Sequence, residues 1–198
     1  MSPPALRRCS LCGKFHAVYL VPELPPGKNR LCLSCWKNWQ AAHPQPGVEL
    51  RGPLMGQGKT CAGILRALPD WFGIPEAVDR YEREIDALPT WLALDGEQVV
   101  GFLSLKQHYP HAAELYVMGV LPAWHRRGIG RRLAALAEAW LRDQGVEYWQ
   151  VKTLGPSHPD EHYAATRAFY ESLGFHPLEE FTTIWDEHNP CLILVRRV

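Results

Sequence analysis

Apolar residues recur with two different periods in the chain after residue 60, and the two periods predict helices and strands in a defined order. Helical spacing at Ile64, Leu65, Leu68, Trp71 and Phe72 predicts a first helix, and a second begins at Pro75. An Asp-Gly pair between two β-rich runs is typical of a hairpin. The strands expected from these patterns are 91–94, 99–105, 114–120, 146–154, 181–185 and 191–195.

The most informative junction is the run from Trp124 to Leu133, where an apolar strand ends and an amphipathic helix begins. Gly128 and Gly130 let the backbone turn tightly and approach a ligand without Cβ obstruction. Successive N–H groups at a helix N-terminus attract anions, and three arginines add full charges: Arg126, Arg127 and Arg131. The run predicts a phosphate-binding loop, although a glycine-rich turn alone fits a plain strand-to-helix turn equally well.

The segments around this loop favour the phosphate-binding loop over a plain strand-to-helix turn. Upstream is the strand 114–122, and downstream the strand 146–154 is followed by the segment 163–175. Together they resemble the GCN5-related N-acetyltransferases (the GNAT family) over roughly residues 61–198. The family pattern of Gln or Arg, two variable residues, Gly, one variable residue and Gly or Ala falls on residues 125–130, with His125 as a departure.

This resemblance implies an α/β fold with a mixed sheet, the GNAT acyl-CoA N-acyltransferase fold. Two parallel strands, 114–120 and 146–154, would splay apart to admit the pantetheine arm of acetyl-CoA. A backbone N–H of Val120 or Leu121 would polarise the thioester carbonyl, and Tyr163 replaces an Asn that is frequent in the family. The cofactor-binding residues expected are Val120, Leu121, His125, Arg126, Arg127, Gly128, Ile129, Gly130, Arg131, Tyr163 and Arg167.

The chemistry implied is direct transfer of acetyl to an amine, by an N-acetyltransferase with an unknown acceptor. A protonated amine has no lone pair, so a base must accept its proton. The family's base position falls on Glu114, for which we expect partial burial beside Tyr116 and Trp124, or else a solvated position at a strand edge. The family's donor to the leaving thiolate falls on Tyr170, whose alternative role is core packing. Acceptor contacts are expected from Trp71, Phe72, Tyr81, Trp185 and Glu187.

A separate signal lies at the N-terminus, where two Cys-x-x-Cys pairs are separated by nineteen residues. Tetrahedral zinc needs four such converging ligands, and so short a segment needs a metal to fold. We therefore expect a small N-terminal zinc-binding domain, a zinc ribbon or treble clef, with a hairpin between the pairs and a short helix over 36–42. Its ligands would be Cys9, Cys12, Cys32 and Cys35.

The domains expected are a zinc module at 1–46, a linker rich in Pro and Gly at 47–60 and a GNAT domain at 61–198. Within the linker, Gly56–Thr60 resembles a nucleotide P-loop, but Pro53 stands where that motif needs Gly. Outside the zinc module, Cys61 and Cys191 are expected to be buried thiols.

Charge is unevenly placed, because residues 1–46 hold six Lys or Arg and one acid, whereas the whole chain is neutral. The alternative function is therefore a CoA-sensing adaptor whose basic zinc module binds nucleic acid or a protein partner. A purely stabilising role or a homodimer contact also stays open for the module. No run approaches the roughly 20 apolar residues of a membrane span, and the N-terminus lacks a signal-peptide core, so we expect a cytoplasmic protein.

Overall fold

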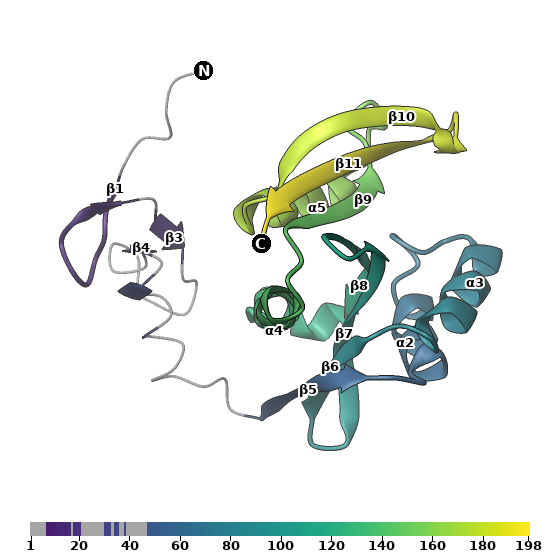
Figure 1. Ribbon diagram of the computed structural model, residues 1–198, viewed down its shortest axis with the longest axis horizontal. Helices are drawn as coiled ribbons and strands as arrows, with labels where there is room; N and C mark the ends of the chain where they lie inside the picture. Colours follow the sequence, from purple (N-terminus) through teal and green to yellow (C-terminus); the bar gives the residue numbers. More distant parts are fainter. Residues whose placement is uncertain (1–6, 17, 21–29, 33, 36–37, 39–46) are drawn as a thin grey trace. The chain divides into compact units, whose positions relative to one another are not determined.

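The computed structural model describes residues 7–16, 18–20, 30–32, 34–35, 38 and 47–198. The chain divides into two compact units, Met1–Gly47 and Val48–Val198. The larger unit contains a seven-stranded sheet in the order β10-β11-β9-β8-β7-β6-β5 (Figure 1). All neighbouring strands are antiparallel except β8 and β9, which are parallel. The predicted mixed α/β sheet is confirmed.

From α2 onward, the elements follow the predicted order. The strands of the large sheet are β5 (Val48–Leu54), β6 (Thr90–Asp95), β7 (Gln98–Tyr109), β8 (Ala112–Val120), β9 (Tyr148–Leu154), β10 (His176–Asp186) and β11 (Asn189–Arg197). The helices are α2 (Gly58–Arg66), α3 (Pro75–Ile85), α4 (Ile129–Asp143) and α5 (Glu161–Ser172), with a 3₁₀ turn at Pro122–Trp124. Among the described residues, no helix is both long enough and apolar enough to cross a bilayer.

Two apolar layers cover the two faces of the sheet, because successive side chains of a strand point to opposite faces. On one face α4 contributes Leu133 and Leu141, which lie in a cluster with Leu115 and Trp149. On the other face the cluster joins α2, α3 and the sheet through Ile64, Leu65, Val78, Ile85, Leu92, Phe102 and Val117. β8 therefore lies between the two apolar layers, with Leu115 in one and Val117 in the other.

The linker expected at 47–60 differs from the structure, since β5 occupies 48–54 and α2 begins at Gly58. β5 is one of the two edge strands of the sheet and pairs only with β6. Most of its side chains are exposed, so it carries no clear apolar alternation. Gly52 and Pro53 interrupt its register, which made the segment resemble a loop.

The P-loop-like run has a packing role instead. Gly58 begins α2, and its N–H donates to Asp86 Oδ1 at 2.7 Å. A Cβ at position 58 would lie 1.9 Å from the carbonyl oxygen of Glu82 in α3. Glycine therefore allows the N-terminus of α2 to pack against α3.

We expect Gly58→Ala to lower the free energy of unfolding by about 3 kcal/mol, because the backbone of α3 would have to move. Gly63→Ala in the same helix is the matched control, since a Cβ there meets no atom within 4 Å. That control should raise stability by roughly 0.5–1 kcal/mol through helix propensity. Urea unfolding followed by circular dichroism measures both, and similar values for the two variants would contradict the packing role.

The small unit contains two short antiparallel pairs. β1 (Arg7–Arg8) pairs with β2 (Phe15–His16), and β3 (Val18–Leu20) pairs with β4 (Arg30–Cys32). The second pair agrees with the expected hairpin, whose turn at 25–29 lies outside the described residues. The helix expected at 36–42 also lies outside them, apart from Asn38.

Candidate active site

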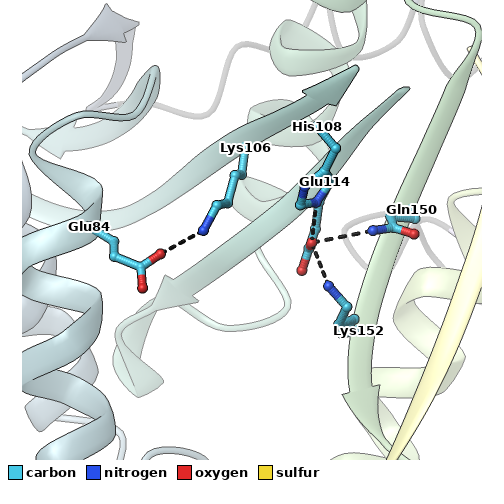
Figure 2. Close-up of polar contacts among 6 residues, drawn as sticks. All are labelled: Glu84, Lys106, His108, Glu114, Gln150 and Lys152. Carbon is cyan, nitrogen blue, oxygen red and sulfur yellow. Dashed lines mark hydrogen bonds and ion pairs between the residues drawn. The ribbon is translucent and has the colours of Figure 1, made fainter. Parts of the chain in front are cut away.

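The parallel strands β8 and β9 separate part-way along their length. They pair from Ala112 with Tyr148 to Leu115 with Val151, although both strands continue further. On the other side of β8, the register with β7 skips Tyr116. Such a bulge bends a strand, and the two ribbons diverge beyond Glu114 and Gln150 (Figure 2). The expected splay is therefore present.

The register shows which backbone groups of β8 face this opening. The N–H of Leu121 donates to the carbonyl oxygen of Val100 at 2.8 Å. In the antiparallel register this bond makes Gly101 and Val120, which lie opposite each other, a non-hydrogen-bonded pair. The N–H and C=O of Val120 therefore point away from β7, and by the same alternation so do those of Met118. Leu121, one of the two expected donors to a thioester carbonyl, is engaged elsewhere. Met118 was missed because the sequence alone does not define this register.

His125 contacts the edge of the opening. Its Nε2 lies 2.6 Å from the carbonyl oxygen of Val120. Its ring also meets Trp71 edge-on, with 5.8 Å between ring centroids. The side chain expected to contact the cofactor therefore contacts the protein backbone.

The glycine loop is shaped for an anion. Gly128 is the N-cap of α4 with φ 75°, and a glycine offers no side chain to cap the first-turn N–H groups. The first turn of α4 holds no acidic residue. A Cβ at Gly130 would lie 3.1 Å from Phe169, so this glycine serves close packing, and Ile129 is buried in the core. The uncapped amides fit a phosphate group.

The arginines of the loop are placed differently from one another. Arg126 and Arg127 are exposed, and the Arg127 guanidinium lies over the Trp124 ring at 4.6 Å from its centroid. Arg131 instead donates to the carbonyl and hydroxyl oxygens of Ser172 at 3.1 and 2.7 Å. The structure therefore leaves two arginines at the loop and directs the third to the end of α5.

Arg126 is the one non-glycine residue of the described chain with positive φ, at 64°. A side chain in this conformation costs about 1–2 kcal/mol, so we expect Arg126→Gly to stabilise the unliganded protein by about 1 kcal/mol. The same change should weaken binding of CoA, because a cation beside the loop is lost. Thermal unfolding and calorimetric titration with CoA measure the two effects.

Arg127→Gly is the control for the opposite effects on stability and on CoA binding, since Arg127 does not have positive φ. It should weaken CoA binding without the gain in stability, because glycine adds freedom to the unfolded chain. Equal stability changes in the two variants would show that the left-handed backbone at Arg126 carries no strain.

Glu114 lies at the point of separation and is 4% exposed. Its Oε2 lies 2.7 Å from Lys152 Nζ, 2.7 Å from His108 Nε2 and 3.3 Å from Gln150 Nε2 (Figure 2). We call these four residues the Glu114 cluster. Glu114 is therefore buried, as one of the two expectations had it, but the three polar side chains that contact its carboxylate do not include Tyr116 or Trp124. A second ion pair, Lys106 with Glu84 at 2.7 Å, lies beside the cluster.

Tyr170 is buried on α5, with its ring 5.6 Å from that of Phe169 and 6.1 Å from that of Phe175. Burial raises the pKa of its phenol, so the hydroxyl stays protonated at neutral pH. Its ring contacts belong to core packing, and a protonated phenol can also donate a hydrogen bond.

The other two α5 residues of the expected face are bonded to the protein. Tyr163 donates its hydroxyl to the carbonyl of Trp71 at 2.7 Å, and burial raises its pKa to about 12. Arg167 donates to the carbonyl of Leu154, the last residue of β9, at 2.9 Å. The side chains of Tyr163 and Arg167 therefore bind backbone carbonyls that border the gap between β8 and β9.

Thr153 was missed by the sequence analysis. It lies on β9 beyond the last residue paired with β8, it is 3% exposed, and its Oγ1 has no hydrogen-bond partner among the described residues. A buried hydroxyl of this kind is costly unless a ligand or water satisfies it. Because it lies on the part of β9 that is not paired with β8, Thr153 is a candidate contact for a polar ligand.

The aromatic residues expected to contact the acceptor mainly pack against each other. Trp71 Nε1 donates to Thr166 Oγ1 at 3.0 Å, and Tyr81 lies between Phe72 and Tyr116 at centroid distances of 6.0 and 5.4 Å. Trp185 is 40% exposed on β10. Their contacts show ring packing, and their role toward an acceptor stays a prediction.

The two cysteines of the large unit are buried, as expected. Burial raises the pKa of the Cys61 thiol to about 12 and that of the Cys191 thiol to about 11. A thiol held protonated is a poor nucleophile. These residues give no support to a covalent acetyl-cysteine route.

The four N-terminal cysteines converge. Their sulfur atoms all lie within 4.8 Å of one another, and none forms a disulfide. The Cys12 and Cys32 sulfurs are 3.8 Å apart, which matches the roughly 3.8 Å between ligands of a tetrahedral ion with 2.3 Å Zn–S bonds. Cys32 N also donates to Cys9 Sγ at 3.3 Å, a bond typical of the shell around a metal ligand. The donor set therefore fits zinc.

Comparison with known proteins agrees with this geometry. The structure resembles the PaiA N-acetyltransferase of Thermoplasma acidophilum, solved in complex with coenzyme A, with a TM-score of 0.58, 17% identity and coverage of 76% of this chain and 99% of that one. The fold is thus the acetyltransferase fold. Residues 59–175 match the acetyltransferase (GNAT) family, and the chain belongs to that family.

Curated relatives include two proteins named mycothiol acetyltransferase. One, from Salinispora arenicola, is 34% identical over 177 residues, which cover 80% of this chain and 56% of that protein. Another, from Corynebacterium glutamicum, is 37% identical over 93 residues, which cover 47% of this chain and 29% of that protein. The matches therefore span between about a third and about half of the relatives' length.

Proposed function

We propose that this chain is an N-acetyltransferase that moves acetyl from acetyl-CoA directly to an amine. The observation that carries the proposal is the ion pair of Glu114 with Lys152 at the point where β8 and β9 separate. A buried carboxylate there holds an alkyl amine at 2.7 Å, which is the distance at which it could hold an acceptor amine and accept its proton.

Several features support acetyl-CoA as the donor. The first-turn amides of α4, with Arg126 and Arg127, suit its diphosphate. The backbone N–H and C=O of Met118, which face the split, suit the amides of its pantetheine arm, as an added strand would. The unpartnered Thr153 hydroxyl offers one more polar contact.

The transfer then balances as follows. The amine nitrogen forms a bond to the acetyl carbon, the carbon–sulfur bond breaks, and the nitrogen loses one proton to Glu114. The departing thiolate can accept a hydrogen bond from Tyr170, whose hydroxyl stays protonated because burial raises its pKa, and it takes its proton from water as CoA leaves. Val120 N–H is the candidate donor to the carbonyl oxygen.

We also propose that residues 1–46 form a zinc module separate from the catalytic unit. The convergence of four sulfurs within 4.8 Å supports it. Zinc would serve as a structural ion there, because four protein ligands leave no open position for a substrate. It would take no part in the transfer.

A thiol-release assay with the full-length chain tests the function. Purified protein is mixed with acetyl-CoA and a panel of amines, and free CoA and product mass are followed together. We expect CoA release that depends on the amine and equals the acetylated product. Tight CoA binding with no turnover across the panel would favour the sensor function.

A further inference from the structure

A second feature of the large unit is a cavity of about 320 Å³ at the other end of the β8–β9 pair. It lies where both strands begin, whereas the split lies toward their ends. The volume is at the lower end of the range for small-molecule sites. The residues that line it are His108, Tyr109, Ala112, Ala113, Tyr148, Gln150 and Val195.

Alternate residues of β9 connect this cavity with the proposed centre of transfer. Tyr148 and Gln150 line the cavity. Gln150 also contacts Glu114, and so does Lys152. Lys152 directly follows the last β9 residue that pairs with β8, so it lies where the split begins. These three side chains share one face, because the side-chain period of a strand is two. Glu114 therefore lies between the cavity and the split. His108 also belongs to both groups, since it lines the cavity and contacts Glu114.

The walls of the cavity suggest what it binds. Tyr109 and Tyr148 are 65% and 44% exposed, which is unusual for large rings. His111 stacks on Tyr109 with an interplanar angle of 15° and meets Tyr148 edge-on, so the rings support one another. Among the described residues, no carboxylate, Lys or Arg lines the cavity, while His108 and Gln150 offer hydrogen-bonding groups. Such walls suit a flat, uncharged ring.

We propose, on the basis of the acetyltransferase function above, that this cavity binds the acceptor and selects a small amine carried on a planar ring. Two residues along a strand span about 7 Å. A ligand whose ring lies beside Tyr148 therefore needs only a short chain to bring its amine to Glu114. A ring with a two- or three-carbon aminoalkyl arm fits this spacing. Donor and acceptor would then reach Glu114 from opposite ends of the strand pair.

Kinetics with two probe amines of similar basicity test the selection. We expect 2-phenylethylamine to have a lower KM than n-hexylamine, and Tyr148→Ala to raise the KM for 2-phenylethylamine about tenfold with kcat unchanged. The KM for n-hexylamine should not change. Leu178→Ala, which removes an exposed apolar side chain of β10 outside the cavity, is the control and should alter the KM for neither amine. Equal effects of the two variants, or no ring preference, would overturn the proposal.

A binding measurement separates this inference from the proposed function. Ligand-observed NMR with 2-phenylethylamine and the full-length protein needs no turnover. Binding that is lost in Tyr148→Ala supports the cavity even if no acetyl transfer occurs, in which case the proposed function alone fails. Acetyl transfer together with binding that does not depend on Tyr148 would retain the function and overturn the cavity. Circular dichroism of both variants confirms that they fold, which exposed positions should permit.

Discussion

Replacing Glu114 with Gln should lower kcat for amine acetylation by about 10²- to 10⁴-fold, the range typical of a lost general base. The amide keeps the size of the side chain, but it cannot accept the proton that the attacking amine must lose. Binding of acetyl-CoA should persist, because the loop and the split strands are untouched. Stopped-flow thiol release and calorimetric titration with CoA measure the two quantities in one preparation.

The control for this variant is Glu84→Gln. Glu84 is a neighbouring carboxylate with the same kind of partner, since it lies 2.7 Å from Lys106 Nζ, but its side chain is 35% exposed and it is outside the Glu114 cluster. We expect its kcat to match that of the unmodified protein. If Glu114→Gln also retained full kcat, Glu114 would have no role as the base, and its ion pair with Lys152 would be structural only.

The fold was predictable where each element carries its own period. The order of helices and strands from α2 to β11 follows from local apolar spacing and from the turn residues between elements. β5 was not predictable, because an exposed edge strand with Gly52 and Pro53 has the composition of a loop. Its pairing with β6 depends on a partner about forty residues away along the sequence, which no local pattern reports.

The candidate site also has one part that the sequence predicted and one part that it did not. The anion loop is a local structure, so its glycines and helix start were visible in the sequence. The partners of Glu114 were not, since Lys152 is 38 positions away and reaches the carboxylate only because β8 and β9 are parallel neighbours in one register. The bulge at Tyr116 likewise decides which amides face the split, and it has no sequence signature of its own.

Removal of zinc should unfold the N-terminal unit while the large unit stays folded. A structural zinc site in a small domain contributes about 10–16 kcal/mol of binding free energy, which is more than a segment of this size gains from its core. The large unit has its own sheet and two apolar layers, so it does not need the metal. We expect one zinc per chain, and we expect a chelator to expose residues 1–46 to limited proteolysis.

Matched cysteine variants of the full-length chain make this test specific. Cys32→Ser removes one ligand of the converging set, so zinc content and protease protection should both fall. Cys61→Ala removes a buried cysteine of α2 that is outside the set, and it should leave zinc content unchanged. Protection of residues 1–46 that survives complete zinc removal would show that this segment folds without a metal, and packing alone would then have to stabilise it.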